Sequence, residues 1–228
     1  GEFKDEILTL NRLAQELRKE RFKHGAIAFE RDEMRFNLDD KGRPIGVYMK
    51  IQKEANQLIE EFMLLANRRV AEYCAHRMVN GRKVARPMVF RVHDEPAEDK
   101  LERFREFALR FGHYFKAQKG RAIAKEMNKL LDTINGRPEH NAITTLAVRS
   151  MAKAVYTTDN IGHYGLAFPY YTHFTSPIRR YPDMMVHRLL ASYLSGAKSA
   201  DKVHLEQLAV HSTEREIIAS DAERASIK

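Results

Sequence analysis

Residues 173–181 decide the fold of this chain, and they read His173-Phe174-Thr175-Ser176-Pro177-Ile178-Arg179-Arg180-Tyr181. Two adjacent arginines follow a pair of hydroxyl side chains here. A guanidinium can bind a phosphate through two hydrogen bonds at once, so Arg179 is the residue type that grips a phosphate. Ser176 and Thr175 can donate hydrogen bonds to the same anion. The stretch therefore predicts an anion-binding site.

The same stretch also has the pattern of a helix start. Serine is a preferred N-cap and proline is preferred at the first helical position, so Ser176-Pro177 predicts a helix N-terminus. Free N–H groups at such a start favour an anion. In the competing interpretation, Ser-Pro only caps a turn and the arginines pair with Asp183 or with glutamates. The residues alone leave the two interpretations equally open.

The overall composition supports an anionic partner. The chain has 228 residues and a formal net charge of +8, with a sequence pI near 9.5. This length fits one large domain or two small ones. The excess of positive charge favours a polyanion, and nucleic acid is the first candidate.

Cysteine content and hydropathy limit the class of protein further. Cys74 is the only cysteine, so no intrachain disulfide can form. No apolar run approaches the roughly 18 residues that a membrane span needs, and no signal peptide is visible. We therefore expect no membrane partner and a cytoplasmic location.

Outward from residues 173–181, apolar periodicity predicts the secondary structure. Helices are predicted over residues 6–21, 53–78, 101–111, 123–134, 139–153, 182–196 and 202–226. Strands are predicted over residues 26–30, 34–38, 46–51 and 87–93, with strand and loop over 156–175. Residues 39–42 predict a hairpin turn. With no repeat and no linker, we predict one α+β fold, a helix-rich domain packed on a small mixed sheet.

Several runs together resemble one known family. They are Gly162-His163-Tyr164-Gly165-Leu166, residues 171–183, His187-Arg188, and further blocks at residues 23–30, 58–67 and 90–94. The chain thereby resembles the ribonuclease II/ribonuclease R (RNB) exoribonuclease family, with ribonuclease R as the closer branch. The resemblance implies part of an RNB catalytic domain. It also implies a processive, hydrolytic 3′→5′ exoribonuclease that threads single-stranded RNA down a basic channel and releases nucleoside 5′-monophosphates.

The resemblance assigns roles residue by residue. Arg179 matches the arginine that contacts the phosphate being cleaved, where it would stabilise charge in the transition state. Phe29 matches an aromatic that stacks on the terminal base, a contact worth roughly 1–3 kcal/mol. The alternative for Phe29 is a core aromatic on a strand. Arg180, His173 and Ser176 are expected to shape the pocket without doing chemistry.

Two carboxylates are implied as ribose contacts. Glu60 matches a carboxylate that binds the 3′-terminal ribose, but Glu61 fits equally well because both lie off the apolar stripe of their helix. Glu223 matches a second ribose-contacting carboxylate. Its alternative is a solvated position on a helix face.

The family also implies two metal ions, normally magnesium, which activate water and stabilise the leaving oxygen. The family's aspartate motif that binds them lies N-terminal to every matched block, and we do not find it in this sequence. We also find none of the flanking oligonucleotide-binding barrels. We therefore expect residues 1–228 to be the C-terminal portion of an RNB catalytic domain. Alone, it should be inactive and should self-associate through surface exposed by the truncation.

Two other interpretations remain open. The chain could be a non-catalytic RNA-binding or scaffold module that retains the basic channel. It could also be a metal hydrolase unrelated to RNA, built on His163, His173 and Asp183.

Overall fold

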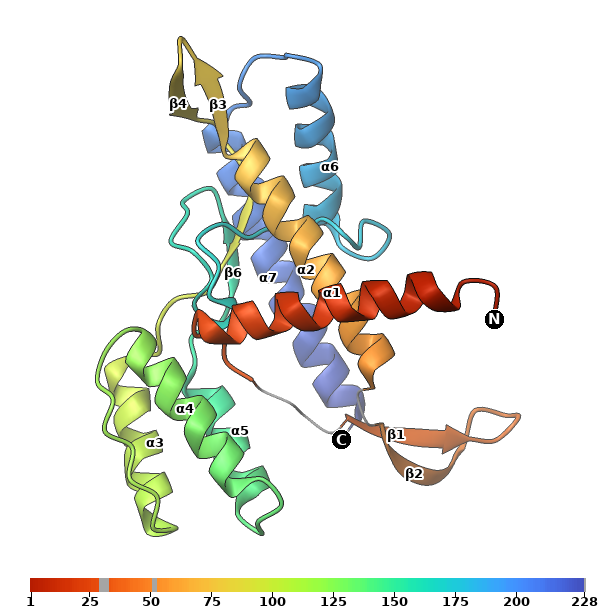
Figure 1. Ribbon diagram of the computed structural model, residues 1–228, viewed down its shortest axis with the longest axis vertical. Helices are drawn as coiled ribbons and strands as arrows, with labels where there is room; N and C mark the ends of the chain where they lie inside the picture. Colours follow the sequence, from red (N-terminus) through yellow and green to blue (C-terminus); the bar gives the residue numbers. More distant parts are fainter. Residues whose placement is uncertain (29–32, 51–52, 228) are drawn as a thin grey trace.

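The computed structural model describes residues 1–28, 33–50 and 53–227, and Figure 1 shows their arrangement. The helices are α1 (Lys4–Lys23), α2 (Glu54–Cys74), α3 (Glu98–Arg110), α4 (Arg121–Ile134), α5 (His140–Ser150), α6 (Tyr181–Leu194) and α7 (Lys202–Ile227), with a 3₁₀ turn at Tyr164–Leu166. The strands are β1 (Glu33–Leu38), β2 (Pro44–Lys50), β3 (His76–Val79), β4 (Arg82–Ala85), β5 (Phe90–Val92) and β6 (Val155–Thr157). Each helix predicted from periodicity is present.

The helix-rich α+β fold class is confirmed. The described strands pair as three separate two-stranded antiparallel sheets, β1–β2, β3–β4 and β5–β6. A parallel bridge between His93 and His163 continues the β5–β6 ribbon. Among the described residues, no helix has the length and apolar character that a membrane span requires.

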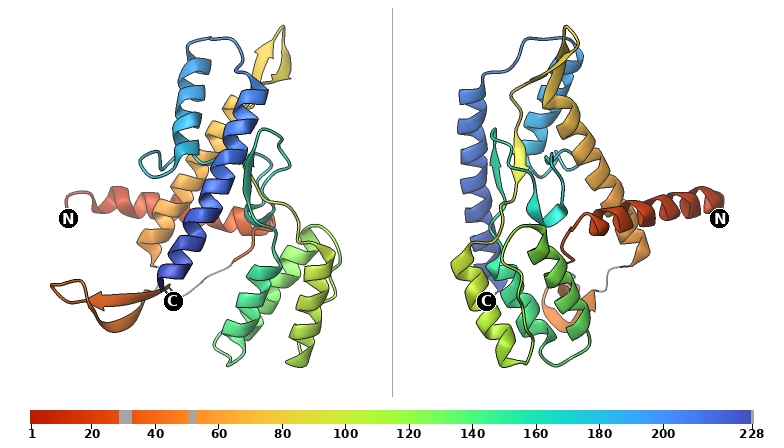
Figure 2. Two further views of the ribbon diagram at one scale, coloured as in Figure 1. Left: turned by 180° about the vertical axis from the view of Figure 1, so that it is seen from behind. Right: turned by 60° about the vertical axis from the view of Figure 1, so that its left-hand side comes forward.

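Two apolar cores hold the elements together. One lies among α3, α4 and α5, with Phe104, Met127 and Ile143 fully buried. These three helices form a unit beside the rest of the chain in both further views (Figure 2). The other core joins the end of α2 to β5, β6, α6 and α7 around Val89 and Val186. This second core carries the elements that bear residues 173–183.

The helix predicted over residues 53–78 ends earlier, at Cys74, and residues 76–79 form strand β3 instead. The guanidinium of Arg86 donates to the carbonyls of Tyr73 (2.8 Å) and Cys74 (3.1 Å) and so caps the end of α2. Asn80 and Gly81 both have positive φ, 48° and 74°. That conformation matches the tight two-residue turn that Asn-Gly favours, and it pairs β3 with β4.

The strand predicted over residues 26–30 is wrong for its described part, residues 26–28, which have no strand partner among the described residues. Their backbone binds a side chain instead, because Asn128 donates to the Ala26 carbonyl (2.7 Å) and accepts from the Ala28 amide (2.9 Å). The Ile27 amide donates to the Gly165 carbonyl at 2.9 Å. Phe29, the predicted stacking aromatic, lies outside the described residues.

Candidate anion-binding cleft

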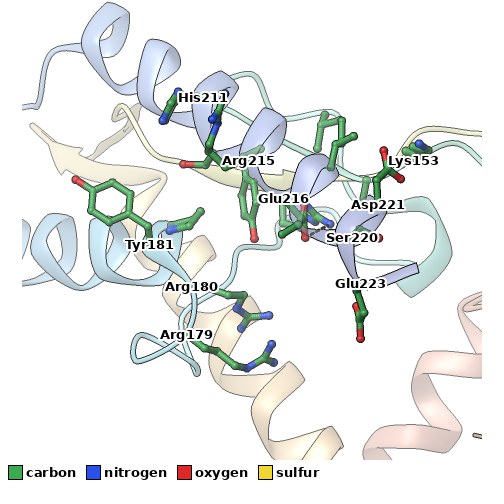
Figure 3. Close-up of a pocket in the computed structure, with 18 of the residues that line it drawn as sticks. Lys153, Arg179, Arg180, Tyr181, His211, Arg215, Glu216, Ser220, Asp221 and Glu223 are labelled. Atoms are coloured by element: carbon green, nitrogen blue, oxygen red, sulfur yellow. Dashed lines mark hydrogen bonds and ion pairs between the residues drawn. The ribbon is translucent and has the colours of Figure 1, made fainter. Parts of the chain in front are cut away.

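A cleft of about 1050 Å³ lies between α7, the start of α6 and the segment around β6. Figure 3 shows Arg179 and Arg180 reaching toward it from the loop before α6, and Glu223 from α7. Six of the lining side chains are basic and three are acidic. The basic ones are Arg91, Lys153, Arg179, Arg180, Arg215 and Arg224, and the acidic ones are Glu216, Asp221 and Glu223. The cleft is therefore electropositive overall, as an anion site requires.

Pairing within the cleft occupies some of these cations. Arg91 binds both carboxylate oxygens of Glu216, at 2.5 and 3.1 Å. Arg224 lies 3.5 Å from Asp221. Across the described ranges, no carboxylate lies within ion-pair distance of Arg179, which is exposed. Arg179 can therefore meet an incoming anion without first giving up a partner.

Arg180 differs from its neighbour because it is neutralised by a buried carboxylate. Asp183, whose side chain is 0% exposed, accepts hydrogen bonds from Arg180 Nε (2.8 Å) and Nη2 (2.9 Å). The same carboxylate accepts from the Ser176 amide at 2.7 Å. The interpretation that pairs the arginines with Asp183 is therefore confirmed for Arg180 and wrong for Arg179.

The helix start predicted at Ser176-Pro177 is wrong. Helix α6 begins at Tyr181, with Arg180 as its N-cap. The Ser176 carbonyl accepts from the amides of Arg179 (3.3 Å) and Arg180 (3.1 Å), so the residues between form a turn. Asp183 binds the amide that opens this turn, which holds Arg179 at a fixed place ahead of the helix.

A second anchor for the loop comes from α2, at the end of the family block 58–67, and the sequence assigned it no role. The buried Asn67 accepts hydrogen bonds from the amides of Phe174 (3.0 Å) and Thr175 (3.2 Å) and donates to the Tyr171 hydroxyl (3.1 Å). His187 of α6 stacks on Phe174, with ring centroids 4.1 Å apart. Asn67 interrupts an apolar stripe, and that polar residue on a buried face was the signal available.

His163 and His173, near the cleft, are largely shielded from solvent and neutral, whereas His211, which lines the cleft, is exposed. The Nδ1 atom of His173 and the Tyr156 hydroxyl share a hydrogen bond of 2.7 Å. Burial, aided by Arg180 and Arg91, lowers the pKa of His173 to about 2. Burial, aided by His93, lowers the pKa of His163 to about 3. Neither ring can exchange a proton near neutral pH, so His173 shapes the site through packing and its hydrogen bond.

The two candidate ribose contacts on α2 share a partner, Arg21 of α1. Glu61 has a side chain only 3% exposed and binds Arg21 through both oxygens, with Arg18 3.7 Å away. Glu60 is 39% exposed and lies 3.4 Å from the same guanidinium. Glu60 therefore keeps surface available to a ligand, whereas Glu61 is held in a buried ion pair. Neither residue lines the cleft, and Ser176 does not line it either.

The residues that the structure describes do not fit a magnesium site. Within them, no group of three or more histidine, cysteine, aspartate or glutamate side chains converges as a metal would need. The structure does not support a metal hydrolase built on His163, His173 and Asp183. The Asp183 carboxylate already accepts hydrogen bonds from Arg180 and Ser176, so it is not available as a metal ligand.

Comparisons with known proteins converge on one family. The RNB domain family matches residues 2–196. Ribonuclease R 1 of Lactococcus lactis is 37% identical over 224 residues, which are 96% of this chain and 26% of that protein. The chain therefore spans about a quarter of the length of this relative.

Solved structures agree with the sequence match. The structure of Mycoplasma genitalium RNase R in complex with ribose-methylated single-stranded RNA has a TM-score of 0.83 and 27% identity, over 96% of this chain and 34% of that one. Yeast Ssd1, described as a pseudonuclease, has a TM-score of 0.59 and 27% identity, over 71% of this chain and 20% of its own.

Proposed function

The chain belongs to the RNB domain family, and on that premise we propose that it is the C-terminal portion of the catalytic domain of a hydrolytic 3′→5′ exoribonuclease. The proposed substrate is single-stranded RNA, degraded in the cytoplasm to nucleoside 5′-monophosphates. The ribonuclease R relatives support the enzyme class. The M. genitalium relative forms a complex with single-stranded RNA, and this supports the proposed substrate.

The observation that carries this proposal is the contrast within the Arg179-Arg180 pair. Arg179 is an exposed cation in an electropositive cleft, on a turn that buried groups of α2 and α6 hold in place. A donor fixed in advance can stabilise the charge that develops on a phosphoryl group without reorganising during the reaction. Arg180 cannot do so while Asp183 neutralises it. We assign Arg179 to the phosphate and Arg180 to positioning.

Ribose binding is assigned to carboxylates. Glu60 is the proposed contact with the 3′-terminal ribose, because Glu61 is buried against Arg21. Glu223 lines the cleft and is exposed, which supports its assignment as a second ribose contact. Phe29 is retained as the proposed stacking aromatic on the sequence resemblance alone.

Magnesium enters this proposal only as a cofactor of a longer protein, in which aspartates of another segment would supply its ligands. The residues of this chain would bind and orient the RNA. Self-association of the chain is proposed to use the β1–β2 hairpin. Its exposed apolar side chains include Phe36 (49%), Ile45 (70%) and Val47 (55%).

The test incubates this chain with 5′-labelled single-stranded RNA and magnesium and resolves the products by length. Intact RNA is expected from the chain alone, and a ladder of products is expected once an aspartate-bearing RNB segment is joined to it. A ladder from the chain alone would show that it holds its own metal site and would contradict the assignment as a portion of the domain.

A second candidate function is a non-catalytic RNA-binding module. Two observations favour keeping it: the described residues hold no metal-ligand cluster, and one structural relative is called a pseudonuclease. This candidate predicts RNA binding without a product ladder even when the upstream segment is present.

A further inference from the structure

A second cationic surface lies away from the cleft, on the β3–β4 hairpin. Residues 76–86 contain four basic side chains of lysine or arginine and no acidic one. The hairpin projects beyond the end of α2 in Figure 1 and in both views of Figure 2. From Asn67, which anchors the Arg179 loop, seven residues of α2 cover roughly 10 Å to Cys74. The four-residue strands then reach about 13 Å further.

Three of the four cations on this hairpin carry unneutralised charge. Arg77, Arg82 and Lys83 are exposed, and in the described part of the chain no carboxylate pairs with them. The nearby Glu72 is already bound by Arg68 (3.0 Å) and Arg69 (2.9 Å). The hairpin therefore presents positive charge that no described carboxylate offsets.

The pairing register places like charges close together. Arg77 lies opposite Val84 and Arg82 lies opposite Val79, so the two arginines are diagonal neighbours on one face. Lys83, opposite Met78, is on the other face. Neighbouring like charges destabilise a sheet, and an anion that lies along the ribbon would relieve this repulsion.

The fourth cation, Arg86, fixes the hairpin. It donates to the end of α2 and lies over the ring of Tyr193, with its guanidinium carbon 4.1 Å from the centroid. A pocket of about 340 Å³ opens at the hairpin base. Its lining includes Arg77, Lys83 and Arg86 and one acidic residue, Glu72, besides Tyr73, His76 and Met78. Partial burial, Lys83 and Arg86 lower the pKa of His76, as expected in an electropositive pocket. Tyr73 is 48% exposed and offers a ring for stacking.

We propose that the β3–β4 hairpin is a second RNA-binding surface, which holds the phosphate backbone of single-stranded RNA through Arg77, Arg82 and Lys83. A groove of cations beside an exposed aromatic is how proteins bind single strands without sequence preference. A-form duplexes suit the ribbon less, because their major groove is too narrow and deep for side chains to read. This inference rests on the proposed RNA substrate and adds a site remote from the Arg179 loop.

The test measures binding of labelled RNA by fluorescence anisotropy across a range of salt concentrations. The hairpin variant replaces Arg77, Arg82 and Lys83 by glutamine. The matched control replaces Lys4, Arg12 and Lys19, exposed residues of α1, and so removes the same charge. Each protein is tested with a tetranucleotide and with a long single-stranded RNA, after circular dichroism shows that the fold is intact.

The hairpin variant is expected to bind the long RNA on the order of tenfold more weakly at moderate salt. Its slope of log affinity against log salt should fall by about two, since each neutralised phosphate of a single strand contributes roughly 0.7. Tetranucleotide binding should be unchanged, and the α1 control should bind the long RNA almost as well as the unaltered chain.

Three results would overturn the inference, and they are distinguishable. Equal losses in the hairpin variant and the α1 control would show a general effect of net charge. Unchanged RNA binding by the hairpin variant would show that RNA binds to another surface of the chain. It would then point to an acidic protein as the partner of the hairpin. Absence of RNA binding by the unaltered chain would overturn both this inference and the proposed function.

Discussion

The Arg179 loop and the β3–β4 hairpin both present arginines to solvent, but they are built differently. In the loop, backbone amides donate to buried side chains of two helices, Asn67 and Asp183, so the position of Arg179 is set before any ligand arrives. On the hairpin, ladder bonds fix the backbone while the exposed cations have no carboxylate partners among the described residues. A fixed donor suits a transition state, whereas unpaired cations suit a flexible polyanion.

The largest expected effect comes from removing the buried carboxylate of the loop. Asp183→Ala should lower the free energy of unfolding by about 3–5 kcal/mol, because it leaves the mostly buried Arg180 unpaired and the Ser176 amide without its acceptor. Denaturant titration measures this. Asp221→Ala, which breaks the exposed pair with Arg224, is the control and should change stability by less than about 1 kcal/mol. Equal losses would show that Asp183 does not anchor the loop.

Removing the second anchor of the loop, Asn67, should lower the free energy of unfolding somewhat less than removing Asp183. Asn67→Ala removes the acceptor for two backbone amides and the donor to Tyr171, so a loss of about 2–3 kcal/mol is expected. The same titration measures it. Asn141→Ala, at an exposed position in the first turn of α5, supplies the control. If Asn67→Ala is as stable as the unaltered chain, the loop is held by α6 alone.

Acid should destabilise the packing beneath the loop. His163 and His173 have folded pKa values near 3 and 2, below the ordinary value of 6.5, so the unfolded chain takes up protons first. Stability is therefore full above about pH 6.5 and falls as the pH drops below it, by roughly 1 kcal/mol per histidine per pH unit. Unfolding titrations between pH 7 and 5 measure the slope. In His173→Phe the slope should be smaller, and an unchanged slope would rule this residue out as its source.

The smallest expected effect is on the hairpin. Gly81→Ala should cost about 1 kcal/mol, because φ is 74° there, while an added Cβ would meet open space. The loss should appear as faster amide exchange in β3 and β4, with the Arg179 loop unaffected. Gly46→Ala, at an ordinary φ on β2, is the matched control. Faster exchange in the loop as well would mean that the two regions are coupled, which contradicts the comparison.

Sequence patterns predicted α3, α4 and α5 well because each packs an apolar stripe against a core, and that periodicity is local. In α1, by contrast, the predicted stripe is largely exposed, with Leu10 at 41% and Leu13 at 48%. Helix ends were less predictable. The predicted helix ran through residue 78, but Arg86 caps α2 at Cys74, and the Asn80-Gly81 turn then favours a hairpin. The information that ended the helix lay beyond the helix itself.

The candidate site was predictable in its residue types and not in its pairings. Residues 173–181 predicted an anion site, yet nothing in them distinguished Arg179 from Arg180. That distinction depends on the buried Asp183, and the turn depends on Asn67, which is more than a hundred residues away in the chain. Long-range hydrogen bonds of this kind have no periodic signature in a sequence.

The most direct test compares the two arginines in a protein that joins this chain to an aspartate-bearing RNB segment, by single-turnover cleavage and by RNA affinity. Arg179→Gln should lower the cleavage rate about 10²- to 10³-fold, as loss of one fixed donor does, while RNA affinity falls much less. Arg180→Gln should chiefly lower stability. Equal losses of cleavage and affinity in Arg179→Gln, or a cleavage rate that survives it, would contradict the assignment of Arg179 to the transition state.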